Sequence, residues 1–171
     1  MNYQESIDWL YGTQTFGIKL GLENVRRLLE ELGVTEALRG RKIIHVAGTN
    51  GKGSVCAFSE RILRDGGLRT GLFPSPHLVT YRERIRVGGS LIPEEGAAGI
   101  LTRIRKLAGD WEQHPTFFEI SLALALRWFC DQDCDAIVLE TGMGGRWDAT
   151  NVAEGTVEII TAVSRDHEQW L

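Results

Sequence analysis

The chain has 171 residues, of which 43% are hydrophobic and 25% are charged, and its net charge is −4. This length allows one globular domain with its own core, and the mildly acidic balance argues against general nucleic-acid binding. The longest apolar run, residues 120–129, is interrupted by Arg127 and is too short to span a bilayer. The first ten residues lack the basic and apolar regions of a secretory signal, so we expect a cytoplasmic protein that binds neither membranes nor nucleic acid.

Three cysteines give an odd count without a disulfide framework. Cys130 and Cys134 could share a helical face and hold a metal, but no second pair completes a zinc site. Cys56 stands alone. We therefore expect reduced thiols that are buried or half-buried.

Two amphipathic helices are predicted at the start of the chain. Apolar residues at helical spacing occupy residues 3–11 and stop at Gly12, and a second set occupies residues 22–32 and stops at Gly33.

A glycine-spaced loop with one lysine follows the apolar run 42–47, which is typical of a strand, and residues 54–63 then have a helical pattern. Glycines let backbone N–H groups turn toward a phosphate, the start of a helix adds partial positive charge, and a lysine adds a full charge. The sequence therefore predicts a phosphate-binding loop, made of Gly48, Thr49, Asn50, Gly51, Lys52, Gly53 and Ser54.

This loop departs from the common pattern GxxxxGK[ST] in two ways. Val46 stands where the first glycine would be, and Gly53 follows Lys52 directly. In the common pattern the hydroxyl after the lysine holds Mg²⁺, so Ser54 or an oxygen from another segment must take that role here. The alternative interpretation is a glycine-rich turn with a surface lysine.

The helix after the loop would carry Val55, Phe58 and Ile62 on one face. A short apolar strand at residues 70–73 then leads to Ser75, which lies between two prolines. Because prolines restrict the backbone, they would hold the Ser75 hydroxyl at the carboxyl end of a strand, where open α/β sheets bind ligands. A plain turn serine is the alternative.

Residues 81–87 alternate between polar and apolar, which would put Arg82, Arg84 and Arg86 on one side of an extended segment. The three arginines could face carboxylates or phosphates. A solvated edge strand explains them equally well.

Two longer helices are predicted in the middle of the chain. Residues 93–107 begin with a proline and two glutamates and continue with apolar residues at helical spacing. Thr116, with Glu119 three residues later, forms a capping box that would open a helix reaching to about Cys130.

A buried-strand pattern at residues 135–140 ends in Glu140. A lone acid after a strand is usually a cap, but phosphate-loop enzymes carry a metal-binding carboxylate at this place, and the glycines that follow permit close approach of a ligand. A last strand is predicted at residues 157–163. Because the carboxyl ends of parallel strands share one edge, a doubly wound sheet would bring Ser75, Glu140 and the loop around one nucleotide.

Three motifs resemble the folylpolyglutamate synthase and dihydrofolate synthase family, a branch of the Mur ligases. They are GTNGKGS at residues 48–54, SPHL at residues 75–78 and ETGMGGRWDATN at residues 140–151, and the resemblance runs from about Tyr3 to Leu171. It implies an α/β fold, namely a phosphate-loop nucleotide-binding doubly wound sheet of the Mur ligase central-domain type. Family members are more than twice as long. Residues 1–171 would then be the amino-terminal part of the ATP-binding domain, with the carboxyl-terminal ligase domain absent and an incomplete sheet that exposes an apolar edge and face.

The resemblance also implies roles for individual residues. Lys52 would be catalytic, and Mg²⁺ would be held by Ser75, Glu140 and His167. Contacts to the pteroate part of the substrate are implied for a further set: Ile18, Lys19, Leu20, Gly21, Thr116, Phe117, Phe118 and Trp147. For residues 18–21 an ordinary lead-in to a helix is the alternative, and for Thr116 it is helix capping alone. Separate roles for Asp148, Thr150 and Asn151 cannot be assigned.

The activity implied by the resemblance is that of an ATP-dependent amide ligase. ATP would phosphorylate a carboxylate of dihydropteroate or of a folate, and the amine of L-glutamate would attack the resulting acyl phosphate. ATP and Mg²⁺ are the implied cofactors, the partners are these small molecules, and a full-length form would be a monomer. A Mur ligase acting on a cell-wall precursor and a non-catalytic nucleotide-binding module are the alternatives.

Overall fold

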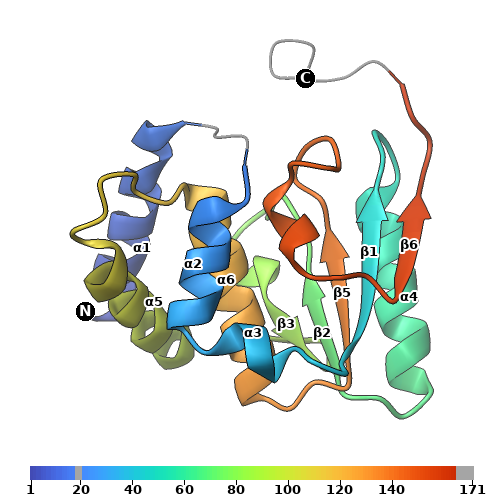
Figure 1. The fold of residues 1–171 in the computed structure, drawn as a ribbon. Helices are drawn as coiled ribbons and strands as arrows, with labels where there is room; N and C mark the ends of the chain where they lie inside the picture. Colours follow the sequence, from blue (N-terminus) through green and yellow to red (C-terminus); the bar gives the residue numbers. More distant parts are fainter. Residues whose placement is uncertain (18–20, 165–171) are drawn as a thin grey trace.

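A computed structural model describes residues 1–17 and 21–164 of the chain, and their strands form one sheet in the order β4-β3-β2-β5-β1-β6 (Figure 1). The last four strands of this order are parallel to one another. They are β2 (Thr70–Phe73), β5 (Ala136–Glu140), β1 (Lys42–Ala47) and β6 (Val157–Ile160). The short antiparallel hairpin β3 (Arg86–Val87) and β4 (Ser90–Leu91) extends the sheet beyond β2.

Helices cover both faces of the sheet, which confirms the predicted doubly wound class. One face is covered by α4 (Lys52–Asp65), and α6 (Phe117–Asp131) covers the other (Figure 1). Around α6 pack α1 (Tyr3–Gly12), α2 (Glu23–Glu31) and α5 (Glu94–Ala108). Short helical turns complete the connections: η1 (Thr13–Phe16), α3 (Val34–Ala37), η2 (Tyr81–Arg84) and η3 (Ala149–Val152).

Strand β5 shows how the sheet divides the core in two. Ile137 and Leu139 join the large apolar cluster on the α6 side, whereas Val138 joins a small cluster with Cys56 of α4. All five residues of β5 are buried. Successive side chains of a strand point to opposite faces, so a continuous apolar run is what a strand covered by helices on both faces requires.

Of the apolar face predicted for the helix after the loop, only Val55 packs toward the sheet, against the small cluster around Val138. Phe58 and Ile62 of α4 are 69% and 71% exposed, and the buried positions of this helix are Cys56 and Glu60. The Glu60 carboxylate is satisfied there because the Thr70 hydroxyl donates to it at 2.6 Å. A buried acid with a partner on β2 therefore replaces the expected apolar contact.

Strand β6 forms the edge of the sheet next to β1, and its end is apolar and exposed. Ile160 is 73% exposed and Val163, just beyond the strand, is 75% exposed. The strand itself ends at Ile160, three residues earlier than predicted, although Ala162 still forms an isolated bridge with Asn50. Exposed apolar side chains thus lie at this edge of the described sheet.

The segment 81–87 is not the extended strand that its alternating pattern predicts. Residues 81–84 form the turn η2, and only Arg86 and Val87 are in a strand. The reason is a capping box, in which the Glu83 carboxylate accepts backbone hydrogen bonds from residues 78–80 at 2.8–3.0 Å. These bonds lower the pKa of Glu83 to about 2. The turn buries Arg84 and leaves Arg82 and Arg86 half-buried.

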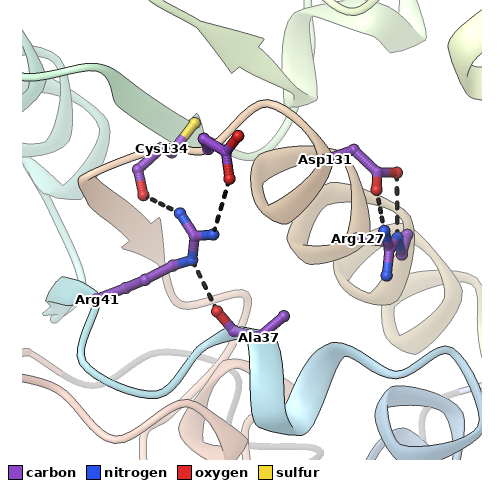
Figure 2. A network of polar contacts seen from close by, with 6 residues as sticks. Ala37, Arg41, Arg127, Asp131 and Cys134 are labelled. Atoms are coloured by element: carbon purple, nitrogen blue, oxygen red, sulfur yellow. Dashed lines mark hydrogen bonds and ion pairs between the residues drawn. The ribbon is translucent and has the colours of Figure 1, made fainter.

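Arg41 joins the turns at the amino ends of β1 and β5 (Figure 2). Its guanidinium donates to the Ala37 carbonyl at 2.8 Å and to the Cys134 carbonyl, and it pairs with the Asp133 carboxylate at 3.6 Å. Arg127 and Asp131 pair separately along α6. Two backbone carbonyls just outside the strands thus receive the guanidinium of Arg41 as a donor.

No helix in residues 1–17 and 21–164 is long and apolar enough to cross a membrane. The three cysteines are buried and unpaired, as predicted.

We expect the thiols of the folded protein to be unreactive. Burial, assisted by the charge of Glu140, raises the pKa of Cys56 to about 12, and burial raises that of Cys134 to about 11, while the thiolate is the reactive form. Labelling with a thiol-specific disulfide reagent at neutral pH should modify none of the three until denaturant is added. Rapid labelling of the folded protein at any of them would contradict this packing.

Candidate functional site

The predicted phosphate loop has the strand, loop and helix order that the sequence indicates. Strand β1 ends at Ala47, and α4 begins at Lys52 after Gly51, which has the left-handed φ of 82°. Gly48 has φ 131°, and a Cβ atom there would lie 2.1 Å from the Thr161 hydroxyl oxygen. Only glycine fits this approach. The Lys52 ammonium lies over the loop and donates to the Gly48 carbonyl at 2.7 Å.

The segment after β6 forms one side of the loop, which sequence reasoning did not predict. Thr161 donates its backbone N–H to Ala47 at 2.9 Å, and Thr49 donates its own to Ala162 at 2.8 Å. The Thr49 hydroxyl accepts from the Ser164 N–H at 3.1 Å and donates to the Ser164 carbonyl at 3.0 Å. These pairings cross more than a hundred residues of sequence, so no local pattern could indicate them.

Glu140 lies at the junction of three chain segments. It ends β5 with 4% of its surface exposed, and its Oε2 accepts the Ser75 backbone N–H at 2.9 Å. Its carboxylate oxygens lie 3.6 Å from where a Cβ on Gly53 would be, so a side chain at residue 53 would crowd them. Burial raises the pKa of Glu140, while the Ser75 N–H, Lys52 and Arg84 lower it. A cation beside this carboxylate would offset its loss of hydration.

An apolar pocket of about 420 Å³ opens beside Ser75. It brings together six of the predicted site residues, namely Gly21, Ser75, Thr116, Phe117, Phe118 and Trp147. Three predicted substrate residues (Ile18, Lys19 and Leu20) and the predicted metal ligand His167 lie outside the described residues. Within residues 1–17 and 21–164 there is no cluster of three or more His, Cys, Asp or Glu side chains that could hold a metal.

Thr116 has the predicted capping role and also lines the pocket. Its hydroxyl accepts the Glu119 N–H at 3.3 Å, and the Glu119 carboxylate accepts the Thr116 N–H at 2.7 Å. The cap places the first turn of α6, with Phe117 and Phe118, along the pocket wall. A Cβ at Gly142 would lie 2.8 Å from the Phe118 ring, so glycine lets the loop after β5 pack against this ring.

Asp148, whose role the sequence left open, shapes the loop after β5. One carboxylate oxygen accepts the N–H groups of Gly142 and Met143, both at 2.9 Å, and the other accepts the N–H and hydroxyl of Thr150. His45 of β1 contacts the same Thr150 hydroxyl at 2.6 Å through Nε2. Because the Thr150 hydroxyl gives its own proton to Asp148, it accepts a hydrogen bond from His45, so the imidazole proton is on Nε2. A buried polar connection therefore links the strand before the phosphate loop to the pocket wall.

Arg84 is a pocket residue that sequence reasoning did not single out from its neighbours. It is 8% exposed, and its Nε donates to Nδ1 of His77 at 2.8 Å. His77 also contacts the Tyr11 hydroxyl at 3.1 Å, which ties this part of the wall to α1. Burial lowers the pKa of Arg84 and, together with the charge of Arg84, that of His77. The alternating spacing of the three arginines does not predict that only Arg84 is buried, because the turn η2 determines which of them faces the interior.

A phosphate loop at the carboxyl edge of a doubly wound sheet, beside an aromatic pocket, defines an α/β domain of the Mur ligase central-domain type. A curated relative from Bacillus subtilis (strain 168), a dihydrofolate synthase/folylpolyglutamate synthase, is 38% identical over 170 residues, which cover 96% of this chain and 39% of the relative. The chain belongs to the dihydrofolate synthase and folylpolyglutamate synthase family. No family model matches it.

Solved structures agree with this relationship. The Escherichia coli protein FolC in complex with DHPP and ADP has a TM-score of 0.88 at 38% identity, covering 97% of this chain and 40% of that one. A bifunctional folylpolyglutamate synthase/dihydrofolate synthase with Mn, AMPPNP and L-glutamate bound has a TM-score of 0.83 at 38% identity, with the same coverage. The chain thus spans about two fifths of the length of the relatives that it matches.

We expect His45 to make stability depend on pH. Burial lowers its pKa below the ordinary 6.5, although Asp148 and Glu158 oppose this shift. The unfolded chain therefore takes up the proton first, so the stabilisation is present above pH 6.5 and is lost as pH falls toward the folded-state pKa. Urea unfolding of wild type and His45→Gln between about pH 7.5 and about pH 5.5 should show the wild-type advantage shrinking. A difference that stays constant would refute the role of this histidine.

Proposed function

We propose that the chain provides the nucleotide phosphate site and the pteroate pocket of an ATP-dependent amide ligase, which adds L-glutamate to dihydropteroate or to the glutamate tail of a folate. The main observation behind this proposal is the position of Ser75 between the pocket and Glu140. It lines the aromatic pocket and also donates its backbone N–H to Glu140, which lies against Gly53 of the phosphate loop. A substrate in the pocket would therefore end where the phosphate site begins.

In this proposal residues 1–171 are the amino-terminal part of the ATP-binding domain. The supporting fact is that the relatives are more than twice as long as the stretch they share with the chain. A carboxyl-terminal ligase domain would complete the ATP and glutamate sites. A cytoplasmic location and a monomeric full-length form stay predictions from the sequence.

ATP would bind through the loop of residues 48–54. Gly48 and Gly51 let the backbone turn without steric conflict. Because α4 begins directly at Lys52, the loop offers the N–H groups of a helix start together with an ammonium group. Lys52 would neutralise charge on the phosphoryl group as it moves. The ADP and AMPPNP bound by the two solved relatives support a nucleotide as a ligand of this chain.

The residues present suit Mg²⁺ as well. Glu140 offers a buried carboxylate with its pKa raised by burial, and Ser75 and Ser54 are the nearby hydroxyl-bearing candidates of the pocket rim and the loop. Hard oxygen ligands are those that Mg²⁺ prefers, and His167 is the further ligand that the family resemblance implies. Bound there, the ion would offset negative charge on the phosphates.

The pocket would take the flat ring system of a pteroate. Phe117 and Phe118 line it with aromatic side chains, and Trp147, which also lines it, is 54% exposed. The substrate carboxylate oxygen would attack the γ-phosphorus of ATP, and the bond to ADP would break to leave an acyl phosphate. The amine of glutamate would then attack the acyl carbon, which forms the amide and releases phosphate and a proton. The relatives are named for folates, which favours this substrate over a cell-wall precursor.

Replacement of Lys52 should weaken ATP binding. A charge-assisted hydrogen bond contributes roughly 1.5–3 kcal/mol, so Lys52→Ala should raise the dissociation constant for Mg-ATP about tenfold or more in calorimetric titration. Lys42→Ala, at the exposed start of β1, is the matched control and should bind as wild type does. Unchanged affinity in Lys52→Ala would rule out the proposed phosphate loop.

Glu140→Gln should instead reduce the dependence of ATP binding on Mg²⁺.

The domain assignment can be tested through phosphate release. With Mg-ATP, dihydropteroate and L-glutamate, and after subtraction of a control without glutamate, a folded sample of this chain should release no glutamate-dependent phosphate, because the glutamate site would lie outside it. Release would contradict the assignment. Binding of a muramoyl precursor in place of dihydropteroate would support the cell-wall alternative.

A further inference from the structure

Arg84 is a buried arginine without a carboxylate partner. It is 8% exposed, and it forms no ion pair within residues 1–17 and 21–164. Arg41 and Arg127, by contrast, each pair with an aspartate (Figure 2). A buried charge without a counter-ion costs free energy, so the setting of Arg84 calls for an anion.

The guanidinium of Arg84 is held with a defined orientation. Its Nε donates to Nδ1 of His77 at 2.8 Å, and its Cζ lies 5.4 Å from the centre of the Phe117 ring. Since Nδ1 is the acceptor, the imidazole proton is on Nε2 and is donated to the Tyr11 hydroxyl at 3.1 Å. His77 is therefore a positioning residue. The hydrogen bonds of the described residues engage only Nε of Arg84, and its two terminal amino groups remain for a ligand.

The position of Arg84 indicates which anion this is. The residue lines the pocket together with Ser75 and Pro76, and its Nε bonds to His77, which directly follows Pro76 in the chain. The charges of Arg84 and Glu140 also affect each other's pKa. This is the end of the pocket next to the phosphate loop. A substrate carboxylate that approaches ATP there meets the negative charge of Glu140 and of the phosphates, and it needs a cation on its own side.

We infer that Arg84 binds the reacting carboxylate of the substrate through its two terminal amino groups and holds it at the boundary between the pocket and the phosphate loop. A guanidinium forms two parallel hydrogen bonds with a carboxylate, which fix both its position and its plane. The same contact would select substrates that end in a carboxylate. This inference rests on the proposed function, because it takes a pteroate as the occupant of the pocket.

The test compares 7,8-dihydropteroate with its carboxamide, which has the same rings and no negative charge. Binding to the 171-residue protein is measured by calorimetry without nucleotide or Mg²⁺. We expect wild type to bind dihydropteroate about tenfold or more tightly than the carboxamide, and Arg84→Gln to bind the two equally. Arg84→Lys, which keeps one charge but cannot form two parallel bonds, should keep only part of the preference.

Arg82→Gln is the matched control, because Arg82 bonds to the Ile92 carbonyl and to Glu94 and does not line the pocket. It should retain the wild-type preference. An Arg84→Gln variant that is folded by circular dichroism and still prefers dihydropteroate as wild type does would overturn the inference. Equal binding of the two compounds by wild type would overturn it without any variant. If wild type binds neither compound, the proposed function itself fails, and this outcome is distinct from the other two.

Discussion

The hydrogen bond from the Ser75 backbone N–H to the Glu140 carboxylate joins the two halves of the candidate site. It links the end of β5 to the segment after β2, and it holds the carboxylate against Gly53 of the phosphate loop. A buried, charged acceptor requires such partners, since an unpaired one would lose its hydration without compensation. The proposed function gives this contact its meaning, because an amide ligase needs its nucleotide site and the pocket for the carboxylate that ATP phosphorylates to meet at one point.

Two other polar connections hold the walls of the pocket in place. His45, Thr150 and Asp148 run from β1 to the loop after β5, and Arg84 and His77 run from η2 to Tyr11 on α1. Each contains a histidine whose hydrogen-bond partners determine its tautomer and whose pKa is lowered by burial. Hydrogen bonds of this kind hold the side chains in fixed orientations, and pre-organised side chains are what orientation of two reacting groups requires.

The side of the molecule formed by α4 and β6 has a different character. Phe58 and Ile62 are exposed on the helix, and Ile160 and Val163 are exposed at and just beyond the end of the edge strand. The proposal that further residues complete the ATP site gives this surface a role, because a continued sheet would extend from β6 and an added layer would cover α4. The described part of the pocket wall belongs to this chain, so the proposed binding of a pteroate can be measured on it.

Local patterns in the sequence determined the strand, loop and helix around Lys52, the capping box at Thr116, the buried strand ending at Glu140 and the family to which they belong. Periodicity and turn chemistry act over a few residues, so they can be read in order along the chain. Tertiary structure alone decided that Arg84 is buried while Arg82 and Arg86 are not, that Glu60 rather than Phe58 faces the sheet, and that residues 161–164 flank the phosphate loop. Those outcomes depend on partners in other elements, namely Thr70 for Glu60, His77 for Arg84 and Ala47 for Thr161. They also depend on the faces that packing leaves free, which no local period encodes.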